Sequence, residues 1–119
     1  MADVVEKLAI GSNNLVGFIL TDDGVPLTAL PLVDEVTTYI GELVTITRSS
    51  SNLDGVDYSQ GGGLIVFNPA QLPEDLSGLK NQSYRVKILV KDGVNTDGVL
   101  FGDKNAEDKL YFDVNRVPS

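Results

Sequence analysis

Apolar and polar positions alternate along much of the chain, most regularly in the run SYRVKILVKD at residues 83–92. Alternation with a period of two residues is typical of a strand that is buried on one face. The run therefore predicts an antiparallel strand at Tyr84–Val90, apolar toward the core and cationic toward solvent. The inward positions are Tyr84, Val86, Ile88 and Val90, and the outward positions are Arg85, Lys87, Leu89 and Lys91.

Four further segments predict strands. The runs VGFIL (residues 16–20), ELVTITR (residues 42–48) and LYFDV (residues 110–114) alternate in the same way. LIVF (residues 64–67) is apolar at every position, which predicts a central strand covered on both faces. No segment keeps an apolar period of 3.6 residues over 11 or more positions, so no long helix is predicted.

Turn residues separate these runs. Asp23-Gly24 with Pro26 predicts a tight turn after the first strand of the series. Residues 49–63, SSSNLDGVDYSQGGG, predict a long polar loop, and a single helical turn is possible at Glu74–Leu79. Six or seven short strands joined by such turns favour an all-β, immunoglobulin-like antiparallel sandwich with Greek-key linkage, because the loops differ widely in length. A small closed barrel is the alternative.

The composition narrows the possible functions. The chain has 119 residues, 42% of them hydrophobic, which suits one domain with an ordinary core. It has no cysteine and no histidine, which removes disulfides, thiolate or imidazole zinc sites and nucleophile–histidine pairs. We therefore expect no enzyme activity, no catalytic residues, no metal site and no cofactor. The first residues lack the pattern of a secretory signal, so we expect folding in a cytoplasm.

The charge is strongly acidic. The net charge is −8, which disfavours nucleic acid and membrane surfaces as partners. Residues 1–60 carry nine acids and two bases, whereas residues 61–119 carry eight acids and seven bases. A functional acidic face is possible, but acids scattered over turns are the simpler interpretation.

The run KDGVNTDGVLFGD, residues 91–103, is the strongest candidate for a cation site. Asp92, Asn95, Asp97 and Asp103 offer the oxygen ligands that hard cations prefer. The spacing is not that of a helix–loop–helix calcium loop, and Asp-Gly pairs are also common turn dipeptides. The simpler prediction is a connection between strands, with a short extra strand or bulge at Val99–Phe101.

Other candidates are weaker. Gly61–Gly63 lacks the Lys and Ser or Thr that follow a phosphate-binding glycine loop. Asn81-Gln82-Ser83 matches a glycosylation sequon, and Tyr58 is a candidate exposed contact in the polar loop. Neighbouring acids could serve as an acid–base pair, although solvated turn acids are the simpler interpretation. These acids are Asp22 with Asp23, Asp34 with Glu35, and Glu74 with Asp75.

The order of turns and strands resembles a known design. FILTDDGVPLTAL is followed by GLIVFNPAQL, the turn DLSGL, the strand YRVKILVKDG and a final LYFDV. This order is similar to the small immunoglobulin-like sandwich of tailed-phage virion proteins, as in the N-terminal modules of baseplate upper proteins. The similarity covers about residues 15–115, and the matching positions are Asp22, Asp23, Gly24, Pro26, Leu27, Gly63, Leu64, Val66, Asp75, Leu76, Tyr84, Val86 and Ile88.

The resemblance implies a virion structural protein that is assembled in the host cytoplasm. A sandwich without a following fibre domain suits a capsid decoration (cement) protein, with a tail, baseplate or neck component as the alternative. The expected partners are further copies of the chain, the major capsid protein or other virion proteins. Residues 1–14 would form an N-terminal arm that reaches a neighbour, and residues 15–119 the sandwich. A glycan-binding adhesion module, reading a host glycan through the loop at Asp54–Gly63, is the other alternative.

Overall fold

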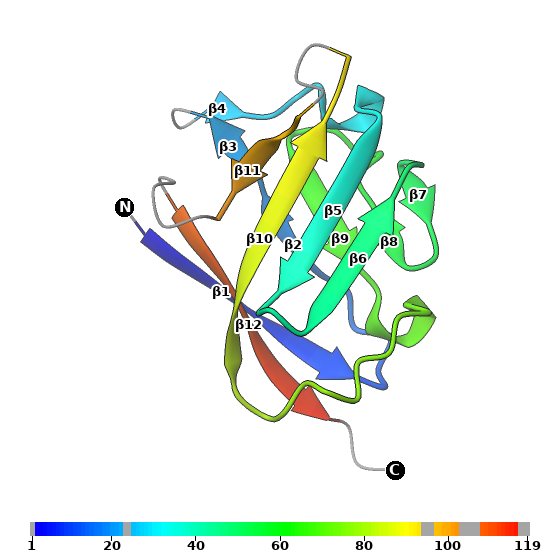
Figure 1. The fold of residues 1–119 in the computed structure, drawn as a ribbon, viewed down its shortest axis with the longest axis vertical. Helices are drawn as coiled ribbons and strands as arrows, with labels where there is room; N and C mark the ends of the chain where they lie inside the picture. Colours follow the sequence, from blue (N-terminus) through cyan, green and yellow to red (C-terminus); the bar gives the residue numbers. More distant parts are fainter. Residues whose placement is uncertain (1, 23–24, 94–96, 103–107, 117–119) are drawn as a thin grey trace.

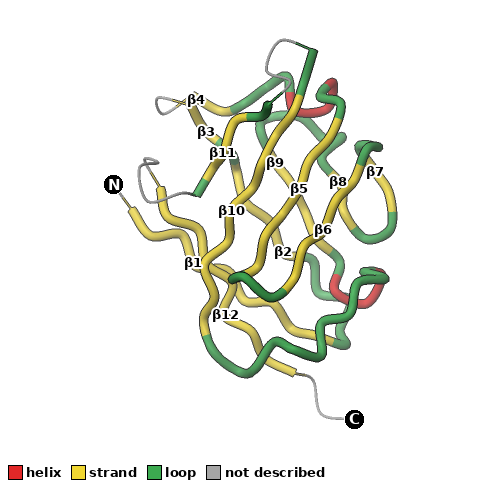
Figure 2. The backbone as a smooth tube through the Cα atoms, in the orientation of Figure 1, coloured by secondary structure: helices red, strands yellow, loops and turns green. Residues whose placement is uncertain are grey.

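The chain folds as a two-layer β-sandwich, seen in a computed structural model that describes residues 2–22, 25–93, 97–102 and 108–116. Figure 1 views the sandwich with β10, β5 and β6 of the larger sheet in front of β2, β9 and β8 of the smaller sheet. Two short 3₁₀ turns, η1 and η2, lie at opposite ends of the molecule (Figure 2). The prediction of an all-β sandwich is confirmed, and the closed barrel is not formed.

Six strands make up the larger sheet, in the order β1-β12-β10-β5-β6, with β11 also paired to β10. All neighbours in this sheet are antiparallel except β1 and β12, which run parallel over nine register pairs. The sheet therefore ends at β1 on one side and at β6 on the other. Its strands are β1 (Ala2–Ile10), β5 (Glu35–Ile40), β6 (Val44–Arg48), β10 (Ser83–Lys91), β11 (Val99–Phe101) and β12 (Asp108–Arg116).

Four strands make up the smaller sheet, in the antiparallel order β2-β9-β8-β7. A separate two-stranded ribbon, β3 with β4, follows β2. The strands are β2 (Val16–Ile19), β3 (Thr21–Asp22), β4 (Val25–Pro26), β7 (Asn52–Leu53), β8 (Val56–Asp57) and β9 (Leu64–Phe67); η1 spans Leu30–Leu32 and η2 spans Pro69–Gln71.

The core lies between the two sheets and is centred on three phenylalanines. Phe112 of β12 packs against Phe18 of β2 at 5.0 Å between ring centroids and edge-on against Phe67 of β9 at 5.5 Å. All three rings are buried, as expected for large apolar side chains on the inner faces of a sandwich. These contacts join the two sheets through the last strand of the chain.

The alternation seen in the sequence sets which face of each strand is buried. In β10, Tyr84, Val86, Ile88 and Val90 are buried, while the residues between them are half-buried on the outer face. In β12, Leu110, Phe112 and Val114 are buried in the same way. The predicted strands at residues 84–90 and 110–114 are confirmed, and so is the short strand at Val99–Phe101.

Part of the predicted N-terminal arm is a strand of the sandwich itself. Ala2–Ile10 forms β1 and pairs with β12 of the same chain. Leu8 lies fully buried in the core, and Val4 and Ile10 pack against it. The expected role of residues 1–14 in reaching a neighbouring subunit stays a prediction.

The polar loop predicted at residues 49–63 contains a small hairpin, which corrects that expectation. Asn52–Leu53 pairs with Val56–Asp57 around the two-residue turn Asp54-Gly55. Both turn residues have positive φ, 45° and 85°, as a tight hairpin turn that matches the strand twist requires. A Cβ at Gly55 would also meet the backbone of Gln71 and Leu72 at 3.0 Å. Both the positive φ and this close approach therefore favour glycine at position 55.

Two smaller expectations also change. β9, predicted to be covered on both faces, buries Ile65 and Phe67 but leaves Leu64 and Val66 half-exposed, because only one sheet packs against it. The segment Glu74–Leu79 forms no helical turn. Instead the Leu79 N–H donates to Leu76 C=O at 3.0 Å, which closes a tight turn.

Candidate functional site

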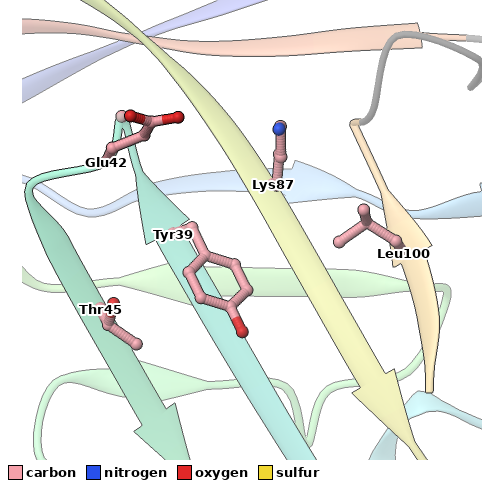
Figure 3. A pocket seen from close by; sticks show the side chains of 6 residues that line it. Tyr39, Glu42, Thr45, Lys87 and Leu100 are labelled. Carbon is pink, nitrogen blue, oxygen red and sulfur yellow. The ribbon is translucent and has the colours of Figure 1, made fainter. Parts of the chain in front are cut away.

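The outer face of the larger sheet carries a shallow hollow of about 390 Å³. Four strands and one turn supply its walls, and Tyr39 of β5 lies in the middle (Figure 3). The residues that line it are Tyr39, Gly41, Glu42, Thr45, Lys87 and Leu100. They come together because β6, β5 and β10 are neighbours, with β11 beside β10.

The register of the sheet explains this arrangement. Tyr39 lies directly opposite Thr45 on β6 and opposite Lys87 on β10. Side chains of directly paired residues point to the same face and lie within contact range. Gly41, with a φ of +59°, starts the β5–β6 turn, and a Cβ there would meet the Tyr84 ring at 3.1 Å. The turn then places Glu42 at the rim of the hollow.

One edge of this face, the outer edge of β6, has unpaired backbone groups. The Gly41 N–H, directly after β5, donates to a carbonyl of β10 at 2.7 Å. Backbone groups alternate in direction along an antiparallel strand, so even-numbered residues of β5 face β6. Because Thr38 pairs with Ile46, the N–H and C=O groups of Thr45 and Thr47 point to the free edge, where the Thr47 C=O accepts a hydrogen bond from Arg48 at 2.8 Å.

The β6 edge has only part of the usual protection against further pairing, because its one charged side chain, Arg48, points inward and is paired with Glu74. Its strand VTITR contains no proline or lysine, and Thr45 and Thr47 are its exposed side chains. Exposed leucines flank it at both ends: Leu43 is 60% exposed in the preceding turn, and Leu53 is 41% exposed. An added strand would form hydrogen bonds with the free backbone groups of this edge.

Arg48, at the end of β6, holds the adjoining loops in place. It is only 5% exposed and forms a bidentate pair with Glu74, at 2.6 and 2.8 Å. Its remaining N–H groups donate to the carbonyls of Thr47, Leu53 and Asp54 at 2.8–3.1 Å. All five guanidinium donors therefore have acceptors. The hydrogen bonds with Glu74 raise the pKa of Arg48 against the effect of burial, and lower the pKa of Glu74.

A second arginine, Arg85 of β10, lies on the outer face with less support. Its guanidinium stacks over the Tyr111 ring at 5.6 Å, and Nη2 donates to Gly102 C=O at 2.6 Å. Its Nε is buried without an acceptor. Gly102 has a φ of +82°, and a Cβ there would clash with Val86 C=O, so this contact depends on glycine.

Tyr58 is not an exposed contact, which corrects the sequence prediction. Its side chain is fully buried, and its hydroxyl donates to Arg48 C=O at 3.4 Å. Burial raises the pKa of Tyr58, with a further contribution from the charge of Glu35. The loop around it is polar, but the hairpin folds this ring into the core.

Those of the other predicted site residues that the structure describes do not come together as a site. Asp34 and Glu74 belong to separate loops, and Glu74 is paired with Arg48. Glu35 instead faces Lys91 at 3.9 Å. In the described ranges no three acids gather as a metal site would require, and Asp23, Asn95 and Asp103 lie outside these ranges. Gly61–Gly63 forms a turn of positive φ, with Gly63 C=O accepting from Leu20 N–H at 2.8 Å.

Asp57 also belongs to a turn rather than to a site. It accepts hydrogen bonds from the backbone and hydroxyl of Ser59 and from Gln60. Burial pushes the pKa of Asp57 upward, but these hydrogen bonds outweigh it, so the pKa lies below its ordinary value. These hydrogen bonds stabilise the turn that follows β8.

Searches with family models, among curated proteins and among solved structures give no significant match to this chain. Within the described residues, no helix has the length and apolarity needed to cross a membrane. What bears on the function of this chain is therefore the geometry of the larger sheet, its open edge, and the resemblance of the sequence to virion sandwiches.

Sequence reasoning missed two of the features that the structure brings together. Arg48 and Glu74 are 26 residues apart, and no local pattern links them. The hairpin at residues 52–57 does have a signal: Asp54-Gly55 is a turn dipeptide flanked by Leu53 and Val56. Strands of two residues are too short to show alternation, so the dipeptide is the sole local indication.

Proposed function

We propose that this chain is a structural protein of a tailed-phage virion that acts by contact rather than by chemistry. Its simplest role is that of a capsid decoration protein, and a tail, baseplate or neck component is the alternative. The partners are further copies of the chain and the major capsid protein or another virion protein. The observation that carries the proposal is the open β6 edge.

The β6 edge supports assembly because unpaired strand edges template further pairing. Thr45 offers its N–H and C=O groups and Thr47 its N–H to an incoming strand, while the Thr47 C=O already accepts a hydrogen bond from Arg48. Main-chain hydrogen bonds then provide affinity, and covering the exposed Leu43 and Leu53 adds apolar contact. We propose that an extended segment of a neighbouring virion subunit adds to the larger sheet at this edge.

The strand order supports the immunoglobulin-like resemblance. One sheet contains β10 between β5 and β12, and the other contains β9 between β2 and β8. In an immunoglobulin-like sandwich one sheet likewise places a strand from the middle of the chain beside two strands near the C-terminus. The fold by itself is compatible with many functions, so the edge geometry and the resemblance are both needed.

The first test measures self-association of the full chain by size-exclusion chromatography with light scattering. We expect a stable oligomer, with a trimer favouring decoration and a larger ring favouring a neck or tail position. The variant with Thr45→Lys and Thr47→Lys should shift to monomer, because lysines on an edge strand oppose further pairing. Its thermal midpoint should fall only slightly, because Thr47→Lys removes one hydrogen bond between the Thr47 and Thr37 hydroxyls.

A matched control adds the same two charges elsewhere. Asn13→Lys with Thr28→Lys changes two exposed positions outside β6, and this variant should keep the oligomer. An unmodified chain that stays monomeric, or an edge variant that assembles as before, would contradict the proposal. Deleting residues 1–14 is a poorer test, because it removes β1 and the buried Leu8 and so disturbs folding.

The glycan-binding alternative loses the residue on which it relied. Tyr58 was its expected stacking side chain, and this ring is buried in the core. A glycan site in the loop at Asp54–Gly63 is therefore not supported by the position of Tyr58.

A further inference from the structure

The structure points to a saccharide-binding subsite in the hollow around Tyr39, on the outer face of the larger sheet. This inference goes beyond the proposed assembly role and does not depend on it. The expected ligand is a neutral pyranose, either the terminal unit of a glycan or an exposed unit within it.

The floor of the hollow is an aromatic platform. Figure 3 shows the Tyr39 ring lying over β5, between Thr45 on one side and Lys87 with Leu100 on the other. The ring is half-buried, so its position is fixed by the sheet while part of it still faces solvent. A pyranose has an apolar C–H face that can pack on such a ring.

The rim supplies both kinds of hydrogen-bonding group. Glu42 at the β5–β6 turn accepts hydrogen bonds, Lys87 of β10 donates them, and the Thr45 hydroxyl does either. Within the described part of the chain, neither Glu42 nor Lys87 has an ion-pair partner. Both side chains are therefore free to bond a ligand that carries several hydroxyl groups.

This combination selects a sugar over other small ligands. A charged ligand of either sign would meet one favourable and one unfavourable charge, because Glu42 and Lys87 have opposite signs. A purely apolar ligand would leave the rim groups unpaired, which costs free energy when they lose water. A neutral pyranose satisfies the aromatic floor and both rim charges at once.

The size of the hollow agrees with this class. About 390 Å³ lies at the lower end of the range of about 300–1,000 Å³ for small-molecule sites. Because the hollow is open, one face of the sugar stays in water, and we expect a dissociation constant on the order of 1 mM for a single sugar unit. Repeated copies on an assembled particle would raise the avidity.

The test titrates the full chain with defined sugars and follows backbone amide signals by NMR. Glucose, galactose, mannose, N-acetylglucosamine and their disaccharides are the probes, chosen after a glycan array with the oligomeric protein. We expect saturable shifts at Tyr39, Gly41, Thr45 and Lys87 for at least one probe. Tyr39→Phe should keep binding, and Tyr39→Thr, which suits a strand, should weaken it about tenfold or more.

Tyr111→Thr serves as the matched control, because it removes a half-buried tyrosine of β12 that does not line the hollow. Binding should survive in this variant. No sugar bound on the array or in the titration, or equal binding by Tyr39→Thr, overturns the inference. Shifts at the hollow that depend on protein concentration and not on sugar also overturn it, because they would make the hollow a contact between copies.

Discussion

Arg48 and Arg85 are two arginines on strands of the same sheet, and they are held in opposite ways. Arg48 points inward, is almost fully buried, and has an acceptor for each of its five donors. Arg85 lies on the outer face with one hydrogen bond, an aromatic neighbour and a buried Nε without an acceptor.

The difference shows how one residue type can anchor a fold or only cover a surface. The Arg48 network links β6 to the β7–β8 hairpin and to the loop that contains Glu74. These segments have few backbone hydrogen bonds to one another, and the hydrogen bonds of the Arg48 side chain connect them instead. The Arg85 side chain contacts Tyr111 of β12 and Gly102 after β11, but β10 and β12 are already paired at this position, so its contacts add little to the connection.

The largest expected effect on the free energy of unfolding comes from Arg48→Met, which removes all the hydrogen bonds of the Arg48 guanidinium. The change leaves the largely buried Glu74 carboxylate and the carbonyls of Leu53 and Asp54 without their donor. We expect a loss of about 3 kcal/mol, the lower end for a broken buried pair because Glu74 is partly exposed. Urea unfolding monitored by tyrosine fluorescence or circular dichroism measures it.

A double variant tests whether the loss comes from the broken pair. Arg48→Met with Glu74→Leu removes both charges, and apolar replacement of a buried pair is often close to neutral. The double variant should therefore be more stable than Arg48→Met alone. A single variant within about 1 kcal/mol of the unmodified chain would show that the network is not an anchor.

Arg85→Met should have a smaller effect, about 1 kcal/mol or less. One hydrogen bond and one cation–π contact are lost, each worth about 1 kcal/mol. Removing the Nε group that has no acceptor offsets part of this loss. The same urea titration compares the two arginines directly, and equal losses for both would remove the contrast between the two regions.

The smallest effect is a difference in acid sensitivity. The pKa of Glu74 lies below its ordinary value of 4.5 in the folded chain, chiefly because of the hydrogen bonds from Arg48. Its stabilisation is therefore present above pH 4.5 and is lost as the pH falls through the lower, folded value. Glu74→Gln cannot titrate, so its stability deficit at pH 7 should shrink toward pH 3.

Thermal unfolding at pH 7, pH 5 and pH 3 follows this deficit. Asp57→Asn gives a comparison, because the pKa of Asp57 is also lowered but its partners lie within three residues in one turn. A deficit for Glu74→Gln that stays constant over this pH range would argue against a role for the ion pair in the acid response.

The sequence predicted the regular parts of this fold because their signals are local. Alternation identified β10 and β12, and the buried faces were assigned correctly for Tyr84 and Phe112. The short strand β11 followed from VLF between turn residues. Where a strand is long enough to show its period, burial on one face leaves a readable pattern.

Features that depend on distant segments were not predictable in this way. The polar neighbours of Tyr58 suggested exposure, but burial of its ring is decided by the hairpin that folds it inward. The Tyr39 hollow needs the register of three strands, which alternation does not fix. The pairing of β1 with β12 joins the two ends of the chain, and nothing local to residues 2–10 indicates it.

The parallel pairing of β1 with β12 has a mechanical consequence. Because both strands run the same way, the start of β1 and the end of β12 lie at opposite ends of the pair (Figure 1). A force that pulls these two ends apart acts along the strands and loads the nine register pairs together, in shear. Antiparallel terminal strands would instead open one hydrogen bond at a time. A domain tethered at both ends would therefore resist stretching, and single-molecule pulling from residues 2 and 116 should show a high rupture force.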